Sequence, residues 1–320
     1  MKTNKRLKPF LLLASIAVLA SCKTNKKAEQ IDGVKVVSVN PDYFITDNII
    51  GEITQKTVDL DGTPTLCYVF KTNSRPSEHQ MGPWCPRHID DAKEKGGIWF
   101  KDGNVYDVDG HFIAELADFY EDDQWKVFRE DGSVKYTATQ EECEGAAKPD
   151  VEEAYQNYCV ECLPKYYKDQ ITTFTIPVTP VYTDREQRLG RGGLGGVAFN
   201  GVNFDPPAPT HAILAAHTIA PLDDHGGHVN PHGGYHYHAA TGSTKEVKQA
   251  DVHSSMIGYA IDGFGIYALL DENKNQPTDL DDCGGHVDET RGYHYHAGEP
   301  GGNEIIKCLH GVPGSVHVQE

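Results

Sequence analysis

Basic residues are scarce in this sequence of 320 residues: 29 Lys and Arg stand against 47 Asp and Glu, a formal net charge of −18. A surface with this excess of negative charge repels phosphate backbones, so we expect no nucleic-acid partner. The sequence has no serine elbow and no P-loop. The glycine-rich stretch Leu189–Gly196 lacks the Lys-Ser/Thr pair of a phosphate-binding loop, and we interpret it as a flexible loop or lid.

Long apolar runs are also lacking, because the run from Phe10 to Ala20 is too short to span a bilayer as a mature helix. It follows a basic N-terminus and ends in Leu19-Ala20-Ser21-Cys22, which resembles the lipobox of bacterial lipoproteins. We therefore expect a signal peptide over residues 1–21, a lipid on Cys22 and a tether over 22–42, with a formal charge of −22 after cleavage. This predicts a cell-envelope protein, on the outer membrane of a Gram-negative bacterium, whose lipid contacts the membrane. The alternative is an ordinary secretory signal.

Cysteines are few, and a lipid on Cys22 leaves seven, so at least one remains unpaired. Proximity in the sequence predicts a Cys283–Cys308 disulfide and a Cys67–Cys85 disulfide. Cys159 and Cys162 have redox spacing without a thioredoxin-like pattern around them. We interpret them as a structural disulfide or as partners for Cys143.

Short strands with turn residues between them dominate from Tyr43 onward. Asp-Gly pairs within 98–116 and 125–136 predict β-hairpins. The segment from Asp150, as N-cap, to Pro164 is the best helix candidate. We predict a mainly β fold with a hairpin-rich N-terminal region over residues 43–165, followed by a second domain over 166–320.

The second domain contains a repeat that ends each time in Tyr-His-Tyr-His. Residues 222–239 align without a gap on 280–297, and 13 of the 18 positions are identical. Upstream, 196–204 and 258–266 share a pattern of glycine, alanine, Asn or Asp, and apolar residues. We predict an internal duplication over about 196–239 and 258–297, whose copies pack about a pseudo-twofold axis because neither could bury a core alone.

Three histidines recur at fixed spacing in each copy. On a strand, alternation places the tyrosines of the motif on one face and its two histidines on the other, and a third histidine precedes them by eight residues. Neutral imidazoles of this number suit zinc or copper. The predicted metal ligands are His228, His236 and His238 in the first copy and His286, His294 and His296 in the second.

Neighbouring residues extend this prediction. Gly226-Gly227 and Gly284-Gly285 would let the backbone turn sharply before each strand. The aspartates that precede these glycines could orient the imidazoles: Asp223, Asp224, Asp281 and Asp282. His225 and His232 occur in the first copy alone, which makes it the richer site, and His225 is a further candidate ligand.

The region from Ile171 to Gly311 resembles the YHYH-domain proteins, a family of bacterial secreted and lipid-anchored proteins. The resemblance rests on Gly234–His238, Gly292–His296, Ile257–Tyr267 and the segment from Leu280, with His79–Pro86 similar to the N-terminal part of some members. It names the domain and implies no reaction.

Three functions remain open from the sequence. The first is a lipid-anchored metal-binding protein for copper or zinc, with an unknown small-molecule or protein partner. The second is a metal-dependent enzyme, hydrolytic with zinc or oxidative with copper, for which Asp262, His253 and the paired aspartates are candidate acids or bases. In the third, the histidines are structural and bind no metal.

Overall fold

The structure is a computed structural model that describes residues 33–148, 150–189 and 195–319. The predicted signal peptide, Cys22 and most of the glycine-rich stretch lie outside the described residues. Within the described part of the chain, no helix combines the length and apolarity needed to cross a bilayer.

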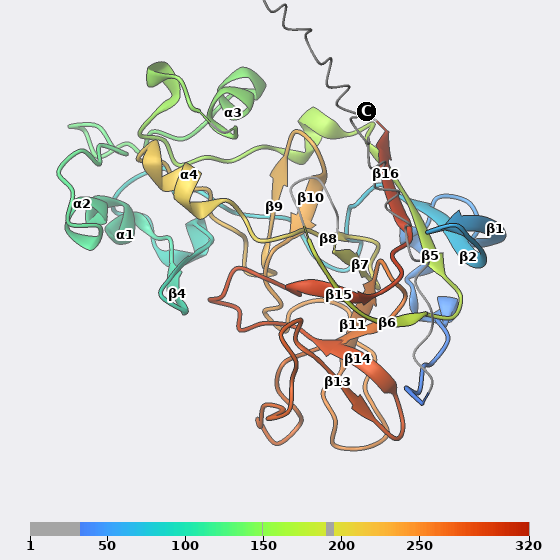
Figure 1. Cartoon of the computed structure of the whole chain (residues 1–320). Coiled ribbons are helices and arrows are strands. Elements are labelled where there is room, and N and C mark those ends of the chain that lie inside the picture. The colour runs from blue at the N-terminus through green and yellow to red at the C-terminus, as the bar shows by residue number, and fades with distance from the viewer. Residues whose placement is uncertain (1–32, 149, 190–194, 320) are drawn as a thin grey trace, which may run out of the picture.

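An eight-stranded sheet occupies the centre of the molecule (Figure 1). Its edge strands β9 and β13 precede the two Tyr-His-Tyr-His strands, β10 and β14, which lie next to them. In sheet order the strands are β13 (Gly285–Asp288), β14 (Gly292–His296), β12 (Gly265–Tyr267), β11 (Met256–Ala260), β7 (Gly196–Ala198), β8 (Asn203–Phe204), β10 (Gly234–Tyr237) and β9 (Gly227–Asn230).

The pairings in this sheet follow the same order from either edge. The outer hairpins β9–β10 and β13–β14 are antiparallel. Next to them, β10 pairs in parallel with β8, and β14 pairs in parallel with β12. At the centre of the sheet, β7 pairs antiparallel with β11. A duplication with a pseudo-twofold axis would produce a strand order that is the same from either edge. The duplication itself stays a prediction. The histidines of the two copies lie apart from one another, because β10 and β14 lie near opposite edges of the sheet.

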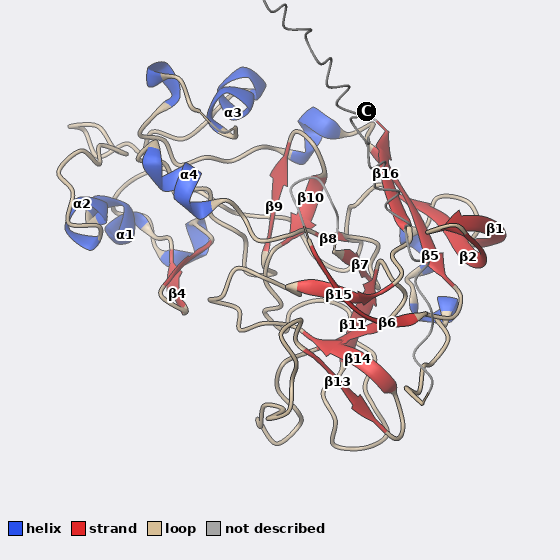
Figure 2. Ribbon diagram, viewed as in Figure 1, coloured by secondary structure: helices blue, strands red, loops and turns tan. Residues whose placement is uncertain are grey.

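Three smaller sheets complete the mainly β fold (Figure 2). The largest joins two strands of the N-terminal region to two that flank the central sheet in sequence, so the regions are continuous through its hydrogen bonds. The strands are β1 (Thr54–Leu60), β2 (Thr63–Thr72), β5 (Ile171–Pro177) and β16 (Ser315–Gln319) in one sheet, β6 (Tyr182–Arg188) with β15 (Cys308–Gly311), and β3 (Ile98–Lys101) with β4 (Asn104–Asp107).

Asp-Gly turns behave as predicted in part. Asp102-Gly103 connects β3 to β4, and both residues have positive φ. The turn at 131–132 forms, but the chain around it pairs through isolated bridges such as Phe128 with Val134. Asp109-Gly110 makes no hairpin, because the Asp109 carboxylate accepts a hydrogen bond from Phe112 N and caps a helix.

The predicted helix from Asp150 to Pro164 is wrong. This segment contains only a short 3-10 turn, Glu153–Tyr155, and Cys159 instead makes parallel bridges with Tyr136 and Ile219. The α-helices, which lie together on one side of the molecule in Figure 2, are α1 (Gly110–Ala114), α2 (Leu116–Phe119), α3 (Gln140–Ala146) and α4 (Thr210–Ala215). A capping box between Thr139 and Glu142 begins α3 and was the sequence signal that we missed.

Three disulfides are present in the described chain. The predicted Cys283–Cys308 disulfide is confirmed. Cys162 forms a disulfide with Cys143, which was one of the two interpretations of the Cys159–Cys162 segment. The Cys67–Cys85 prediction is wrong, because Cys85 pairs with Cys159 and Cys67 is a free, buried thiol. Proximity in sequence failed here because β2, which carries Cys67, packs against β5, far from the segment that carries Cys85.

The main hydrophobic core lies against the central sheet. Among its largest fully buried side chains are Phe199, Ile266 and the motif tyrosines Tyr237 and Tyr295. Burying these residues places the motif histidines on the opposite face of their strands. The core thus fixes both motif strands in orientation and register.

Candidate metal sites

Each motif strand forms an antiparallel hairpin with the strand that carries the third histidine. In the register of β9–β10, His228 is directly opposite His236, and in β13–β14, His286 is directly opposite His294. Directly opposed residues share a face with their side chains close together. The spacing of eight residues therefore brings the histidines together because it matches the length of the hairpin.

A glycine turn before each hairpin supports this arrangement. Gly226 and Gly284 have φ of +83° and +82°. Their carbonyls accept hydrogen bonds from the backbone N–H of His238 and His296, at 2.9 and 2.8 Å. A Cβ at Gly226 would lie 2.2 Å from the Ala239 carbonyl oxygen, so the turn requires glycine there.

The motif tyrosines point to the other face, as predicted, but their hydroxyls do not reach the surface. Tyr235 donates to Asp223 and Tyr293 to Asp281, each at 2.8 Å. The expectation that these aspartates orient the imidazoles is therefore wrong, since each is hydrogen-bonded to a tyrosine on the face opposite the histidines. Asp224 and Asp282 are exposed.

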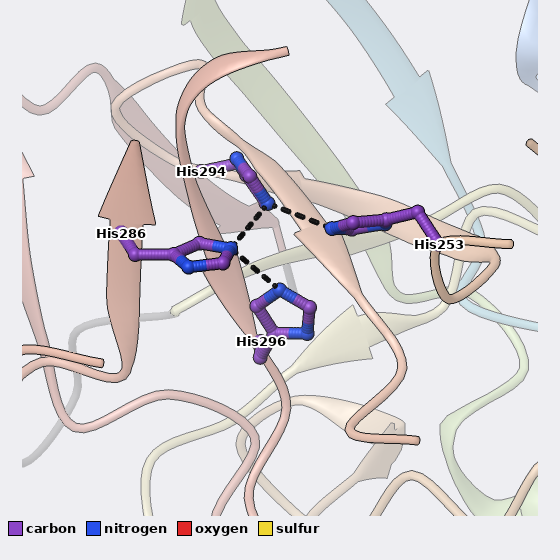
Figure 3. A group of neighbouring side chains, drawn as sticks. All are labelled: His253, His286, His294 and His296. Carbon is purple, nitrogen blue, oxygen red and sulfur yellow. Dashed lines mark hydrogen bonds between the residues drawn. The ribbon is translucent and has the colours of Figure 1, made fainter. Parts of the chain in front are cut away.

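Four histidines form the cluster in the second copy (Figure 3). Nε2 of His294 lies 3.0 Å from Nε2 of His286 and 3.1 Å from Nε2 of His253, and Nε2 of His286 lies 3.2 Å from Nε2 of His296. His253 comes from the segment before β11. From the sequence, His253 was predicted only as a candidate acid or base, whereas in the structure it belongs to the histidine cluster.

The other ring nitrogen of each histidine in this cluster has an oxygen partner. Nδ1 of His294 lies 2.9 Å from the Gly292 carbonyl, Nδ1 of His296 2.9 Å from that of Ala268, and Nδ1 of His253 3.1 Å from that of Ser254. Nδ1 of His286 lies 2.8 Å from an Asp279 carboxylate oxygen. Since a carbonyl only accepts, Nδ1 carries the proton and Nε2 keeps its lone pair.

Burial favours the neutral form of His253, His294 and His296. It lowers the pKa of His294 to about 3 and that of His296 to about 4, with neighbouring histidines adding to the effect. Burial also lowers the pKa of His253. At neutral pH, Nε2 atoms with lone pairs therefore face one another at hydrogen-bond distance without protons between them.

Lone pairs that converge in this way could hold a cation. Nitrogens about 2.0–2.1 Å from a tetrahedral ion lie about 3.3–3.4 Å apart. The observed separations of 3.0–3.2 Å are close to that value. All four imidazoles offer ligand atoms within 4.8 Å of one another and could hold a metal ion.

Three histidines form the cluster in the first copy, with ligand atoms within 4.8 Å of one another. Nε2 of His236 lies 3.1 Å from Nε2 of His238, and Nδ1 of His236 lies 2.9 Å from the Gly234 carbonyl. The Asn230 amide, 3.3 Å away, donates to the same Nε2, which identifies it as the lone-pair nitrogen. Burial lowers the pKa of both His228 and His238 far below the ordinary value.

An acidic residue that the sequence did not point out stands beside this cluster. Oδ2 of Asp205 lies 3.7 Å from Nε2 of His236, while Oδ1 is buried without a hydrogen-bond partner. Burial raises the pKa of this carboxyl, and His236 opposes the rise. Asp205 directly follows β8, and β8 pairs with β10, a contact that the spacing of the repeat did not reveal.

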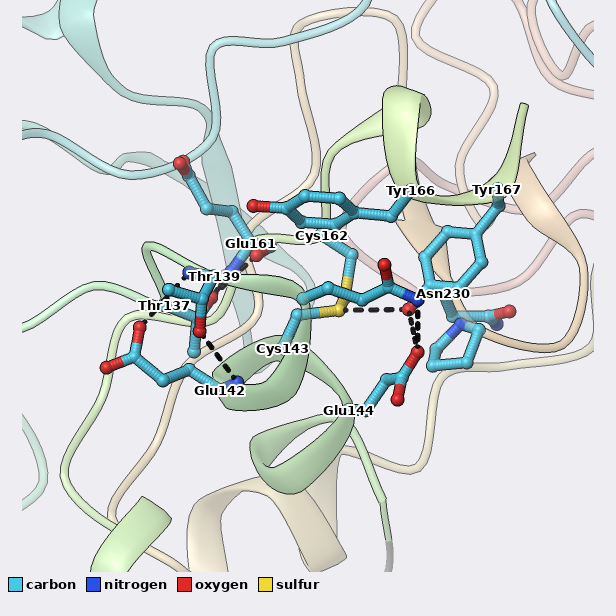
Figure 4. The surroundings of a disulfide bond; sticks show 12 residues. Thr137, Thr139, Glu142, Cys143, Glu144, Glu161, Cys162, Tyr166, Tyr167 and Asn230 are labelled. Atoms are coloured by element: carbon cyan, nitrogen blue, oxygen red, sulfur yellow. Dashed lines mark hydrogen bonds between the residues drawn. A yellow bond between two sulfur atoms is a disulfide. The ribbon is translucent and has the colours of Figure 1, made fainter.

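The first cluster borders a cavity of about 650 Å³ with mainly apolar walls. Asp205, His228 and His238 line one part of it, and Trp84, Ile213 and the prolines of 206–209 line others. The Cys143–Cys162 disulfide ties α3 to the extended segment that forms another wall, and its surroundings include Asn230 (Figure 4).

His225 does not join the first cluster. Its ring stacks on that of His79, with centroids 3.6 Å apart, and its Nδ1 lies 2.9 Å from the Ser243 carbonyl. His232 is exposed on the cavity rim. The expectation that the first copy is the richer site is therefore wrong, because His253 gives the second copy four histidines.

Comparison with protein families adds one finding. Residues 173–279 match the family described as YHYH protein. The match includes the first Tyr-His-Tyr-His strand and Ile257–Tyr267, and it ends before the second motif strand. Comparisons with curated proteins and with solved structures gave no match. The resemblance of the sequence is thereby confirmed over these residues: the chain contains a YHYH domain at residues 173–279.

Proposed function

We propose that this chain is a metal-binding protein that holds zinc or copper in two separate histidine clusters. The observation that carries the proposal is the convergence of unprotonated Nε2 atoms, four in the second cluster, whose Nδ1 protons are directed to oxygens. Structural histidines would instead pair an N–H donor with an acceptor. Imidazole nitrogens favour zinc and copper over calcium or magnesium, which prefer oxygen ligands.

The location belongs to the proposal as well. A lipid on Cys22 would hold the protein at the bacterial cell envelope, on the outer membrane. The disulfides support an oxidising compartment, since such bonds persist outside the cytoplasm. The acidic surface of the chain would attract cations weakly from the surroundings.

The test is metal content by elemental analysis of the full chain, purified in detergent and equilibrated with zinc or copper. We expect one ion per cluster. His236→Ala should remove one ion, His294→Ala the other, and the double variant both. His317→Ala is the matched control, because His317 is exposed on β16 and belongs to neither cluster. Circular dichroism establishes that each variant is folded.

The proposal fails if the replete protein holds almost no metal, or if its metal content is unchanged by both cluster substitutions. A folded protein without metal would support the structural role of the histidines. Labelling with a radioactive fatty acid tests the lipid, which Cys22→Ser should abolish.

A further inference from the structure

We infer that the first cluster is a hydrolytic centre, with Asp205 as its proton acceptor and the adjoining cavity as the binding site for an ester with an apolar acyl group. This inference rests on the proposed function, because it needs an ion on His228, His236 and His238. It assigns different roles to the two clusters: the second holds its ion permanently, and the first uses its ion for chemistry.

The number of ligands differs between the clusters in the way that structural and catalytic sites differ. Four imidazoles would complete the tetrahedral shell of an ion in the second cluster, whereas the three imidazoles of the first cluster would leave one position for water. The three-histidine cluster is also the one that borders the cavity, through His228 and His238. A small molecule in the cavity can therefore reach the open position.

Asp205 supplies the group that the open position needs. The first cluster consists of three histidines whose ligand atoms lie within 4.8 Å of one another, and Asp205 is not part of it. Asp205 therefore lies beside the three histidines and is not one of the proposed ligands. Its Oδ2 is 3.7 Å from Nε2 of His236, close enough to accept a hydrogen bond from a water at the ion. Its Oδ1 is buried with no protein partner, although buried polar atoms are normally satisfied.

The reaction balances with water as the only co-substrate. His228, His236 and His238 would hold the ion, and Asp205 would take one proton from a water bound there while the water oxygen forms a bond to the ester carbonyl carbon. The bond between that carbon and the alcohol oxygen then breaks, and the proton on Asp205 passes to the leaving alcohol. The products are the carboxylic acid and the alcohol, with no change in oxidation state.

The cavity determines the class of substrate. Its volume of about 650 Å³ is within the range of small-molecule sites, about 300–1,000 Å³. Apolar side chains, chiefly alanine and proline, make up most of its lining, and Asp205, His228 and His238 are among its polar groups. An apolar acyl chain would be buried there while its carbonyl faces the ion.

The test uses the full, zinc-loaded chain in detergent with p-nitrophenyl acetate and p-nitrophenyl hexanoate as probes. We expect zinc-dependent hydrolysis, with kcat/KM rising about fourfold for each methylene that the cavity buries. Asp205→Asn should lower kcat about 100-fold or more while zinc content stays unchanged. Asp224→Asn is the matched control, because Asp224 is exposed and belongs neither to a cluster nor to the cavity wall, and it should leave hydrolysis as it is.

Two results would overturn the inference while the proposed function stands. One is a zinc-loaded wild type no faster than Asp205→Asn. The other is loss of the first ion in Asp205→Asn, measured in a His294→Ala background, which would make Asp205 a ligand. Absence of zinc from both clusters would instead refute the proposed function.

Discussion

Replacing His253 with alanine tests the second cluster most directly, because this residue joins the cluster from a different part of the chain. His286, His294 and His296 belong to one hairpin, whereas His253 precedes β11. The substitution therefore removes one ligand and leaves the hairpin intact. Removing His253 from the metal-free protein also separates lone pairs that face one another at 3.1 Å, so we expect little loss of metal-free stability.

The expected magnitude follows from linkage between binding and folding. An ion that binds only the folded state, at a free concentration about 1,000 times its Kd, raises the free energy of unfolding by about 4.1 kcal/mol. Loss of a group that merely supports a ligand lowers metal affinity about 10- to 100-fold. Loss of a ligand should lower it at least about 100-fold, which leaves about 1.4 kcal/mol of stabilisation at the same zinc concentration.

The assay is urea unfolding of the wild type and His253→Ala, each with buffered free zinc and with chelator. The difference between the two proteins in their response to zinc reports the second cluster alone, because the first cluster is the same in both. His317→Ala should respond as the wild type does. Equal stabilisation of wild type and His253→Ala by zinc would refute the reasoning that His253 is a ligand.

Three further predictions concern groups around the clusters. Asp279→Asn should weaken zinc binding about 10-fold by isothermal titration, since Asp279 holds the Nδ1 proton of His286; unchanged affinity would contradict this. Burial raises the pKa of Asp262 in the folded state to about 6, above its ordinary 3.8. The folded state therefore holds a proton that the unfolded state has lost. Between pH 4 and pH 7 the wild type should lose about 2 kcal/mol of stability relative to Asp262→Asn in urea unfolding; a pH-independent difference would exclude this. Replacing Cys143 and Cys162 together with alanine opens a loop with a sequence separation of 19, and should lower the free energy of unfolding by about 3 kcal/mol; a loss below 1 kcal/mol would argue against it.

The repeat allowed much of the site to be predicted from sequence. Alternation along a strand and a fixed spacing of eight residues are local properties, so they correctly brought His228 to His236 and His286 to His294. The mainly β class followed from the same local patterns. The Cys283–Cys308 disulfide was also accessible, because its cysteines are close in the chain.

What the sequence could not reveal depends on contacts between distant segments. Cys85 finds Cys159 at a sequence separation of 74, and the extended conformation that this bridge supports overrides the helical pattern of the residues before Pro164. His253 and Asp205 reach the clusters through sheet pairing, and neither has a motif around it. Sequence reasoning on the aspartates failed because Asp223 and Asp281 are hydrogen-bonded to the motif tyrosines, which alternation places on the face opposite the histidines.

The most informative difference between the two copies lies at one position in the sheet. Phe204 pairs with Tyr237 as Ile266 pairs with Tyr295, so Asp205 and Tyr267 are equivalent in register. In the second copy the Tyr267 ring packs 4.8 Å from that of His294 and covers the cluster, while in the first copy the shorter Asp205 leaves a cavity and offers an unpaired oxygen. Exchanging these residues should exchange the properties: Asp205→Tyr should close the cavity and abolish hydrolysis while zinc remains bound, and hydrolysis that persists in this variant would place the chemistry elsewhere.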